Sequence, residues 1–335
     1  MKIILKIFIV LLILITLSFT LISCAGKQSG ELKEIKLTEV TRSVFYAPQY
    51  AALALGYFED EGLKVELTTS AGADKVTAAV LSGEADIGFC GPESTVYVYN
   101  EGKQNYIITF AQLTKRDGSF LVARQPDPNF TFDKLRGKYI IGGRKGGMPE
   151  MSLEWVLREN GLEPGVDVTV DTSIQFAAMT GAFLQGTGDY VTLFEPAALA
   201  VEKQGKGYIV ASIGKESGVV PYTCYNATKD YIEQNPDVIQ AFTNGLYKGM
   251  KWVEKSSPQK IAEAIHPYFP DMSIEDLTKV VQRYKDQDSW NADPTLTKES
   301  YEHMLDIVIR AGILTDNDRV PYETLFNPSF AQKVK

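Results

Sequence analysis

The sequence predicts an α/β protein with two similar lobes and a helical C-terminal portion. Three observations support this prediction. Strand-like and helix-like segments alternate from Ile35 to Tyr225, two short blocks recur at one constant spacing, and helical spacing alone continues after Tyr225. Regular alternation of strands and helices is typical of a largely parallel sheet covered by helices.

The first half of the chain contains most of the expected strands. Short apolar runs rich in β-branched residues are separated by amphipathic segments, and Pro48 and Gly56 stand at the two ends of one such segment. Proline near the start and glycine at the end are typical of a helix. The expected strands are 35–40, 63–67, 86–89, 106–112 and 120–123, and the expected helices are 48–56, 74–81 and 93–100.

An internal repeat indicates that the second lobe copies the first. Residues 65–70 resemble 168–173, and residues 81–86 resemble 184–189, both at an offset of 103 residues. Pro48 and Pro149 each open an expected helix at nearly the same offset. A shared offset favours two units with the same strand–helix order, although chance similarity of short glycine and aspartate turns is the alternative.

The remainder of the chain has the spacing of amphipathic helices. The expected helices cover residues 235–255, 258–265, 273–285 and 298–311. Ser273 followed by Glu275 and Asp276 is typical of a capped helix start with acidic residues in its first turn. We expect this helical portion to pack on one lobe.

The N-terminus has the pattern of a lipoprotein signal peptide. Lys2 and Lys6 flank the start of an apolar run, which ends in Leu-Ile-Ser before Cys24. This order predicts a signal peptide over residues 1–23, a lipid-modified Cys24 and a flexible tether over residues 24–34. A transmembrane anchor is the alternative, but the apolar run is slightly short for a full span.

Composition argues against several classes of protein. The formal net charge of −8 leaves no electrostatic basis for binding nucleic acid. The chain has two histidines, which argues against a histidine-rich metal site and against Ser-His or Cys-His catalysis, and we expect no metal and no cofactor. Besides Cys24 the chain has Cys90 and Cys224, which could pair but are interpreted as small buried residues.

A glycine-rich loop is the most distinctive candidate for ligand binding. Ligands of open α/β sheets bind where strands end and helices begin. Residues 142–150 form such a junction, with four glycines and two cations before Pro149. Gly146 and Gly147 could offer backbone N–H groups to an electronegative group, with Arg144 assisting. The spacing matches no nucleotide-binding motif, and a plain strand-to-helix turn is the alternative.

Five further residues stand at comparable junctions. Tyr46 could stack on a flat ring, Gln49 and Ser94 could orient it by hydrogen bonds, and the segment that begins at Gly91 offers backbone N–H groups at a helix start. Glu195 stands at the junction of the second unit that mirrors Gly91, and it could accept a hydrogen bond from a ring amine. Tyr46 could equally be part of the core.

Several motifs resemble those of a known family. Ala-Pro-Gln-Tyr at 47–50, Gly-Tyr-Phe-Glu-Asp-Glu-Gly-Leu at 56–63, Leu-Ser-Gly-Glu-Ala-Asp-Ile-Gly at 81–88, and Gly137-Lys138 with the glycine-rich loop are present. They are similar to the SsuA-like and thiamine-pyrimidine-synthase-like (NMT-type) solute-binding proteins of ABC transporters. The resemblance covers about residues 36–255 and does not discriminate between substrates.

This resemblance implies a fold and a division into lobes. It implies a periplasmic-binding-protein type II fold, in which two α/β lobes are joined by a two-strand hinge near residues 117–120 and 221–225. The implied division is 35–117 for the first part of lobe 1, 118–222 for lobe 2, and 223–335 for the second, mostly helical part of lobe 1.

The same resemblance implies a function. It implies an extracytoplasmic lipoprotein, monomeric and not an enzyme, that captures a small solute for an ABC permease and its ATPase. A heteroaromatic solute such as a thiamine pyrimidine precursor is favoured, and a small anion (alkanesulfonate, taurine or nitrate) is the alternative. A pyrimidine-precursor synthase shares the fold, but its cysteine-rich motif and active-site histidine have no counterpart beside Cys90.

Overall fold

The computed structural model describes residues 31–70 and 72–334 of the chain. The predicted signal peptide, most of the predicted tether and the Cys24 lipidation site lie outside the described residues. Residues 33–335 form one compact body. No helix within the described part is both long and apolar enough to cross a membrane.

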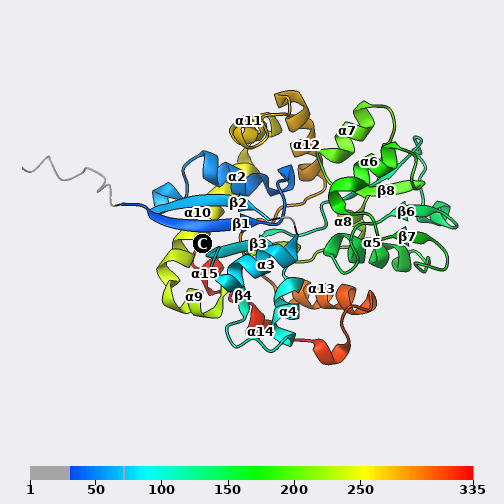
Figure 1. Ribbon diagram of the computed structural model, residues 1–335. Coiled ribbons are helices and arrows are strands. Elements are labelled where there is room, and N and C mark those ends of the chain that lie inside the picture. Colours follow the sequence, from blue (N-terminus) through cyan, green and yellow to red (C-terminus); the bar gives the residue numbers. More distant parts are fainter. Residues whose placement is uncertain (1–30, 71, 335) are drawn as a thin grey trace, which may run out of the picture. The chain divides into compact units, whose positions relative to one another are not determined.

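The first sheet contains five strands, shown in blue and cyan in Figure 1 apart from its later strand β10. Strand β1 pairs in parallel with β2 and β3, whereas β10 pairs antiparallel with β3 and β4. The order across the sheet is β2 (Leu63–Thr69), β1 (Lys33–Glu39), β3 (Ile87–Cys90), β10 (Thr223–Thr228) and β4 (Ile107–Thr114).

The second sheet repeats this plan. Strand β6 pairs in parallel with β7 and β8, and β5 pairs antiparallel with β8 and β9. The order is β7 (Thr169–Asp171), β6 (Tyr139–Ile141), β8 (Tyr190–Leu193), β5 (Phe120–Ala123) and β9 (Tyr208–Ser212). The expectation of a largely parallel sheet is confirmed for four of the five strands in each sheet, which run in one direction, whereas β10 and β5 run against their neighbours.

The repeat predicted from the sequence is confirmed by the topology. Strand β3 covers residues 87–90 and β8 covers residues 190–193, which preserves the offset of 103. In the first unit the helices are α2 (Ala47–Ala54), α3 (Ala73–Ser82) and α4 (Glu93–Asn100). In the second they are α5 (Met148–Glu159), α6 (Met179–Leu184) and α7 (Ala197–Lys203). Equivalent strand-to-helix junctions of the two units are thus built alike.

The chain passes twice between the two sheets. It leaves the first sheet after β4 and enters the second at β5, and it returns from β9 through α8 (Ile213–Glu216) to β10. The lobe boundaries suggested by the sequence, 117/118 and 222/223, fall within these two connections. The division into two moving lobes stays a prediction.

The C-terminal helices follow β10. Helix α10 packs closely on α2, because a Cβ at Gly249 would lie 2.5 Å from the Pro48 carbonyl oxygen. The helices are α9 (Lys229–Gln234), α10 (Pro236–Lys255), α11 (Pro258–Ile265), α12 (Ile274–Asp286), α13 (Lys298–Arg310), α14 (Tyr322–Leu325) and α15 (Ser329–Gln332).

We had expected the helical portion to pack on one lobe, but it contacts both units. On α13, the guanidinium of Arg310 lies 4.9 Å from the Trp155 ring centroid and pairs with Glu159, both on α5 of the second unit. The His303 ring also bonds to the Ser217 carbonyl oxygen at 2.8 Å. Helical periodicity shows that a face is apolar, but it cannot show which element covers that face.

Cys90 and Cys224 face each other across β3 and β10, where they are register partners. Both are free thiols and fully buried. Burial is the main reason that the pKa of Cys90 rises to about 12. A thiol that stays protonated is a poor nucleophile, so these two residues act as small core side chains.

Candidate ligand-binding site

Strand-to-helix junctions of the two units touch each other. The Ser43 hydroxyl donates a hydrogen bond to the Glu195 carbonyl oxygen at 3.2 Å, and the Phe45 and Phe194 rings lie 5.8 Å apart. Ser43 precedes the short helix η1 (Val44–Tyr46) of the first unit, which contains Phe45, and residues 194–195 follow β8. We call this zone the seam, comprising residues 43–46, 90–97, 117–119, 144–152, 194–195 and 222.

Aromatic rings from both units and from one connection fill part of the seam. Tyr222, just before β10, lies 5.9 Å from Phe45 and 6.4 Å from Phe194. Phe176 lies 5.8 Å from Phe194 and is 46% exposed, so the cluster extends to the surface. A Cβ at Gly118 would come within 2.9 Å of both phenylalanines, so this position has room only for glycine. Such rings suit a flat ligand.

A buried carboxyl group lies beside these rings at the first connection. Asp117 is fully buried, and its Oδ1 accepts hydrogen bonds from the Ser119 N–H at 2.6 Å and from the Ser119 hydroxyl. The Tyr222 and Ser152 hydroxyls also donate hydrogen bonds to this carboxyl group. Burial is the largest cause raising the pKa of Asp117 to about 6, and hydrogen bonds from Ser119 oppose the rise.

A second buried carboxyl group stands at the start of α4. Glu93 is 5% exposed, and its Oε2 lacks a partner within the described part of the chain. The carboxylate folds over Gly91, where a Cβ would lie 2.1 Å from Glu93 Oε2. Burial raises the pKa of Glu93 to about 7, and the positive charge of Arg144 opposes this. Arg144 of the second unit therefore acts electrostatically on the first.

The raised pKa of Glu93 predicts a pH-dependent stability. Between pH about 4.5 and 7 the folded protein keeps a proton that the unfolded chain has lost, so the free energy of unfolding should fall as pH rises through this window. The difference corresponds to about 3 kcal/mol. Glu93→Gln should remove that share of the slope in urea unfolding at pH 5 and pH 8, whereas exposed Glu84→Gln should not. An unchanged slope in Glu93→Gln would contradict the assignment.

Glu195 is held by the C-terminal helix α12. Its Oε1 pairs with Arg283, its Oε2 accepts the Leu199 N–H at 2.9 Å, and its own N–H donates to the Tyr284 hydroxyl at 3.0 Å. Burial is the largest cause of its raised pKa, and Arg283 opposes it. Glu195 lies in the seam, but its charge is already compensated by Arg283.

Of the four residues predicted as ligand contacts in the first unit, three lie at the seam: Tyr46, Gly91 and Ser94. Tyr46 is buried at the seam, with its ring 4.5 Å from Phe89. Ser94 lies at the α4 start beside Gly91, donating to the Gly91 carbonyl oxygen at 2.7 Å. Gln49 lies deeper.

The Gln49 amide is engaged within the core of the first unit. Its Nε2 donates to Glu39 at 2.9 Å, and its Oε1 accepts from the Tyr225 hydroxyl at 2.9 Å. Gln49 is fully buried. A direct contact with a ligand would require this internal network to open.

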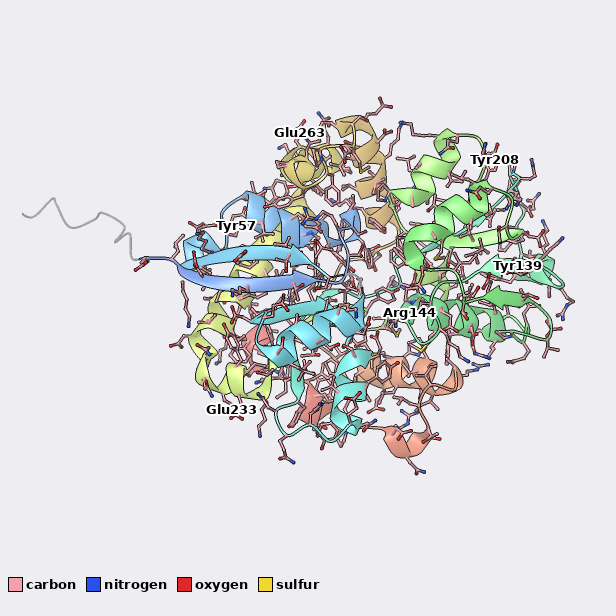
Figure 2. The ribbon with its side chains drawn as sticks, in the orientation of Figure 1. Tyr57, Tyr139, Arg144, Tyr208, Glu233 and Glu263 are labelled. Atoms are coloured by element: carbon pink, nitrogen blue, oxygen red, sulfur yellow. The ribbon has the colours of Figure 1, made fainter. Side chains whose placement is uncertain are left out.

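The backbone N–H groups of the glycine-rich loop that were expected to be free for a ligand are hydrogen-bonded within the protein. The Gly146 N–H donates to Glu150 Oε2 at 3.0 Å, and the Gly147 N–H donates to the Arg144 carbonyl oxygen at 3.1 Å. Arg144 itself is exposed and is labelled in Figure 2. Burial, with the neighbouring Glu154, raises the pKa of Glu150 to about 7. The two amides assigned to an electronegative ligand group are therefore occupied by the loop itself.

Three residues at or beside the seam were not predicted from the sequence as ligand contacts: Asp117, Tyr222 and Arg283. The Asp-Gly-Ser run at 117–119 lies within one crossing implied by the resemblance, and that position was the available signal for Asp117. Arg283 lies in a helix 88 residues beyond Glu195, so no local pattern connects the two.

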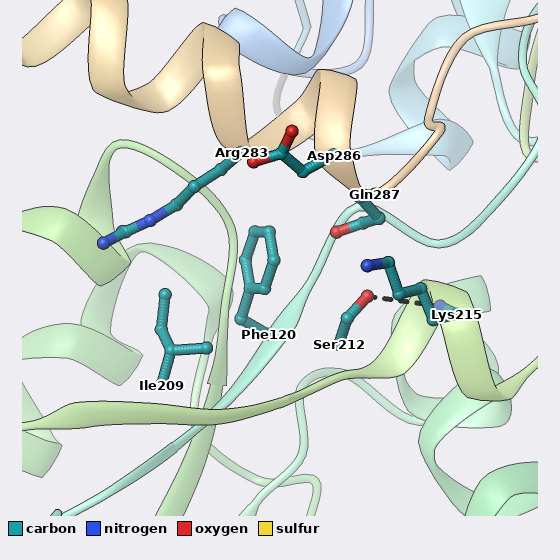
Figure 3. A pocket seen from close by; sticks show the side chains of 7 residues that line it. All are labelled: Phe120, Ile209, Ser212, Lys215, Arg283, Asp286 and Gln287. Carbon is teal, nitrogen blue, oxygen red and sulfur yellow. Dashed lines mark hydrogen bonds between the residues drawn. The ribbon is translucent and has the colours of Figure 1, made fainter. Parts of the chain in front are cut away.

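A shallow pocket of about 170 Å³ lies beside the seam, between β5, β9 and α12 (Figure 3). It contains none of the eight predicted site residues, and at the seam itself side chains from both units pack against one another. Because strand-to-helix junctions of both units meet at the seam, we place the candidate site there. The pocket is lined by Phe120, Ile209, Ser212, Lys215, Arg283, Asp286 and Gln287.

Residues 44–260 match the model of the family described as "NMT1/THI5 like". The chain belongs to the NMT1/THI5-like family. The matched range runs from η1 into α11 and contains all residues of the seam except Ser43.

Individual relatives agree with this membership. YtlA of Bacillus subtilis (strain 168), provisionally named a binding protein, is 42% identical over 320 residues, covering 96% of this chain and 95% of YtlA. The 4-amino-5-hydroxymethyl-2-methylpyrimidine phosphate synthase of Schizosaccharomyces pombe is 23% identical over 241 residues, covering 69% of this chain and 68% of the synthase.

A solved structure supports the fold of this NMT1/THI5-like protein. The alkanesulfonate-binding protein SsuA of Xanthomonas axonopodis, bound to MOPS, superimposes with a TM-score of 0.71 at 14% identity, covering 90% of this chain and 100% of SsuA. Together with the two repeated sheets, this likeness confirms the predicted periplasmic-binding-protein type II fold. At this identity the likeness extends to the fold alone.

Proposed function

We propose that this chain is the extracytoplasmic solute-binding component of an ABC importer. It captures a small heteroaromatic solute, such as a thiamine pyrimidine precursor, between its lobes and delivers it to the permease. The observation that carries the proposal is the seam, where rings from both units lie beside the buried carboxyl groups of Asp117 and Glu93. The 42% identical relative that is named a binding protein supports it.

The two connections between the sheets suit a hinge mechanism. A solute that contacts both units stabilises the closed arrangement, because only that arrangement offers all contacts at once. The Ser43–Glu195 hydrogen bond and the Phe45–Phe194 contact join the two units directly. In this arrangement the side chains of the seam fill the space between the units. A solute would enter that space when the units move apart.

The chemistry of the seam favours a flat ring with hydrogen-bond donors. The Phe45, Phe194 and Tyr222 rings can stack on a planar ligand. Glu93 can accept hydrogen bonds from ring nitrogens or amines. The name of the 23% identical synthase of Schizosaccharomyces pombe refers to an aminopyrimidine, which has both properties.

A small anion is the second candidate solute. Arg144 and the neighbouring Lys145 supply positive charge at the glycine-rich loop, and SsuA, which has the same fold, is named for alkanesulfonate. Against this candidate, the Gly146 and Gly147 N–H groups are occupied. Buried carboxyl groups in the seam would also repel an anion.

An enzyme of the synthase type is the candidate from another class. Both histidines of this chain bond to backbone carbonyl oxygens, His266 to Met272 and His303 to Ser217. Within residues 31–70 and 72–334, no three metal-ligating side chains are grouped. A binding role is therefore favoured, and it predicts that a bound pyrimidine is recovered chemically unchanged.

The decisive experiment identifies the solute. Small molecules released from the purified protein are identified by mass spectrometry, and each is returned to the emptied protein in calorimetric titration. Scattering with and without the solute should show a smaller radius of gyration when it is bound. Recovery of a converted product would support the enzyme, and a tightly bound sulfonate or nitrate would support the anion. Failure of every released compound to rebind would contradict a binding role.

Membrane attachment and partners form the remaining part of the proposal. We propose a monomer that is anchored to the outer face of the cell membrane through lipid on Cys24 and that serves a permease and its ATPase. Cys24→Ser should release the protein to the medium or leave it uncleaved, because the acceptor thiol is lost. Detergent partitioning and intact mass measure this outcome. A mutant that still partitions into detergent at the mature mass would contradict the anchor.

A further inference from the structure

The pocket between the second sheet and helix α12 is separate from the seam. Its volume is about 170 Å³, and none of its lining residues belongs to the seam. One wall comes from β5, β9 and α8 of the second unit, and the other comes from α12. Helix α12 is held on the first unit, where the Tyr284 ring lies 5.0 Å from the Phe45 ring of η1. A molecule in this pocket would therefore join the two units at a second place.

One buried oxygen at this pocket has no hydrogen-bond partner. The Gln287 side chain is 2% exposed, and its Nε2 donates a hydrogen bond to the Asp117 carbonyl oxygen. A carbonyl oxygen only accepts, so the other end of the Gln287 carboxamide is the oxygen, Oε1. No described residue donates to that oxygen. Buried polar atoms in native proteins are nearly always hydrogen-bonded, so Gln287 Oε1 requires a donor that the described residues do not supply.

Figure 3 shows what surrounds this oxygen. The Gln287 oxygen, the Lys215 ammonium group and the Ser212 hydroxyl are turned toward the space beside the Phe120 ring. The Ser212 oxygen accepts the Lys215 backbone N–H at 3.2 Å, so its O–H can donate to a ligand. The pocket therefore offers an unpartnered acceptor, a cation, a hydroxyl donor and an aromatic wall.

These groups are complementary to a small zwitterion. Lys215 attracts an anionic oxygen, whereas the other cation of the lining, Arg283, already pairs with two carboxylates. Gln287 Oε1 needs an N–H or O–H donor, and the Asp286 carboxylate in the same lining favours a positively charged one. Since a water molecule occupies about 30 Å³, the pocket has room for about six non-hydrogen atoms. An amino acid with a short side chain carries both charges within this size.

We propose that this pocket is a second ligand site, which binds a small zwitterionic amino acid. Lys215 and Ser212 hold its carboxylate. Gln287 Oε1 and Asp286 hold its ammonium group, and the Phe120 ring packs against its short side chain. Because the Gln287 amide also binds the outgoing connection, the amino acid is linked to the segment between the sheets. The site goes beyond the proposed function and does not depend on which solute the seam binds.

The test compares L-alanine, which fits this volume, with two analogues that each lack one charge. Propionate lacks the ammonium group, and L-alaninamide lacks the carboxylate. Calorimetric titration of the whole protein should give a dissociation constant for L-alanine of about 0.1–1 mM, a modest value for so small a ligand. Each analogue should bind at least about tenfold more weakly, the usual effect of losing one charged hydrogen bond. Equal binding of all three, or binding of none, would overturn the proposal.

Replacing the two charged residues one at a time should remove each preference separately. Lys215→Met should reduce the preference for L-alanine over L-alaninamide to about threefold or less, and Asp286→Asn should do the same for the preference over propionate. Both side chains are exposed, so neither change should prevent folding. Lys206→Met, with the same charge change on the exposed turn before β9, should keep both preferences. Equal effects of Lys215→Met and Lys206→Met would mean that only net charge matters, which would overturn the site.

A last measurement asks whether the second site acts on the seam, and this step rests on the proposed function. A molecule that joins the two units favours their closed arrangement. Saturating L-alanine should therefore tighten binding of an aminopyrimidine probe, 4-amino-5-hydroxymethyl-2-methylpyrimidine, by about fivefold, and Lys215→Met should abolish the gain. Competition between L-alanine and the probe would overturn a separate site. A probe that fails to bind at all would contradict the proposed solute, while the titrations of L-alanine alone would still decide the second site.

Discussion

Replacing Phe194 by alanine should weaken binding of the aminopyrimidine probe by about 30-fold. Loss of one aromatic stacking face costs about 1–3 kcal/mol, and about 2 kcal/mol corresponds to that factor. Phe194 contributes because it touches Phe45 of the first unit, Tyr222 of the returning connection and exposed Phe176. A solute inserted among these rings would contact both units. Calorimetric titration of the probe measures the change.

Phe132 provides the matched control. It is partly buried, like Phe194, and it packs against Phe130 within the second unit, away from the seam. Phe132→Ala should leave the dissociation constant within about twofold, since it alters no seam contact. Equal loss of affinity in both variants would mean that the effect comes from general destabilisation. Unchanged affinity in Phe194→Ala would place the solute elsewhere, for example in the pocket that Arg283 and Lys215 line.

The fold was largely predictable because its signals are local. Helix α4 begins at Glu93 and ends at Asn100, and β5 covers Phe120–Ala123, both as the sequence indicated. The constant offset of 103 residues showed that the two units share one strand order. The direction of β10 was not predictable in this way, because pairing between strands more than a hundred residues apart depends on tertiary contacts. The same applies to α13, whose partner on α5 lies across the seam.

The candidate site was predictable in position more than in detail. Junction rules led to the loops that contain Glu195, Arg144 and Tyr46, and the structure brings these loops to one seam. Those rules could not show that Gln49 is bound by Glu39 and Tyr225. Whether a polar side chain is free for a ligand depends on its neighbours in space, and a single sequence does not encode those neighbours locally.

Arg283→Met should lower the free energy of unfolding by about 3–5 kcal/mol near neutral pH, the usual cost of removing one partner from a buried ion pair. The reason is Glu195, which is 2% exposed and pairs with Arg283. Arg283 also pairs with Glu202, so one guanidinium serves two carboxylates on or next to α7. Urea unfolding at pH 7 measures the loss. Adding Glu195→Gln to Arg283→Met should restore most of it, because a neutral amide can still accept the Leu199 N–H.

Lys203→Met tests whether burial, and not the mere presence of an ion pair, decides the effect. Lys203 pairs with Asp276 between the same two helices, but the lysine side chain is 58% exposed. Solvent screens such a pair, so its removal should change stability little. Equal losses in Arg283→Met and Lys203→Met would contradict the dominant role of Glu195. If Arg283→Met weakens the solute beyond its effect on stability while Lys203→Met does not, the compensated Glu195 charge helps to hold the two units closed.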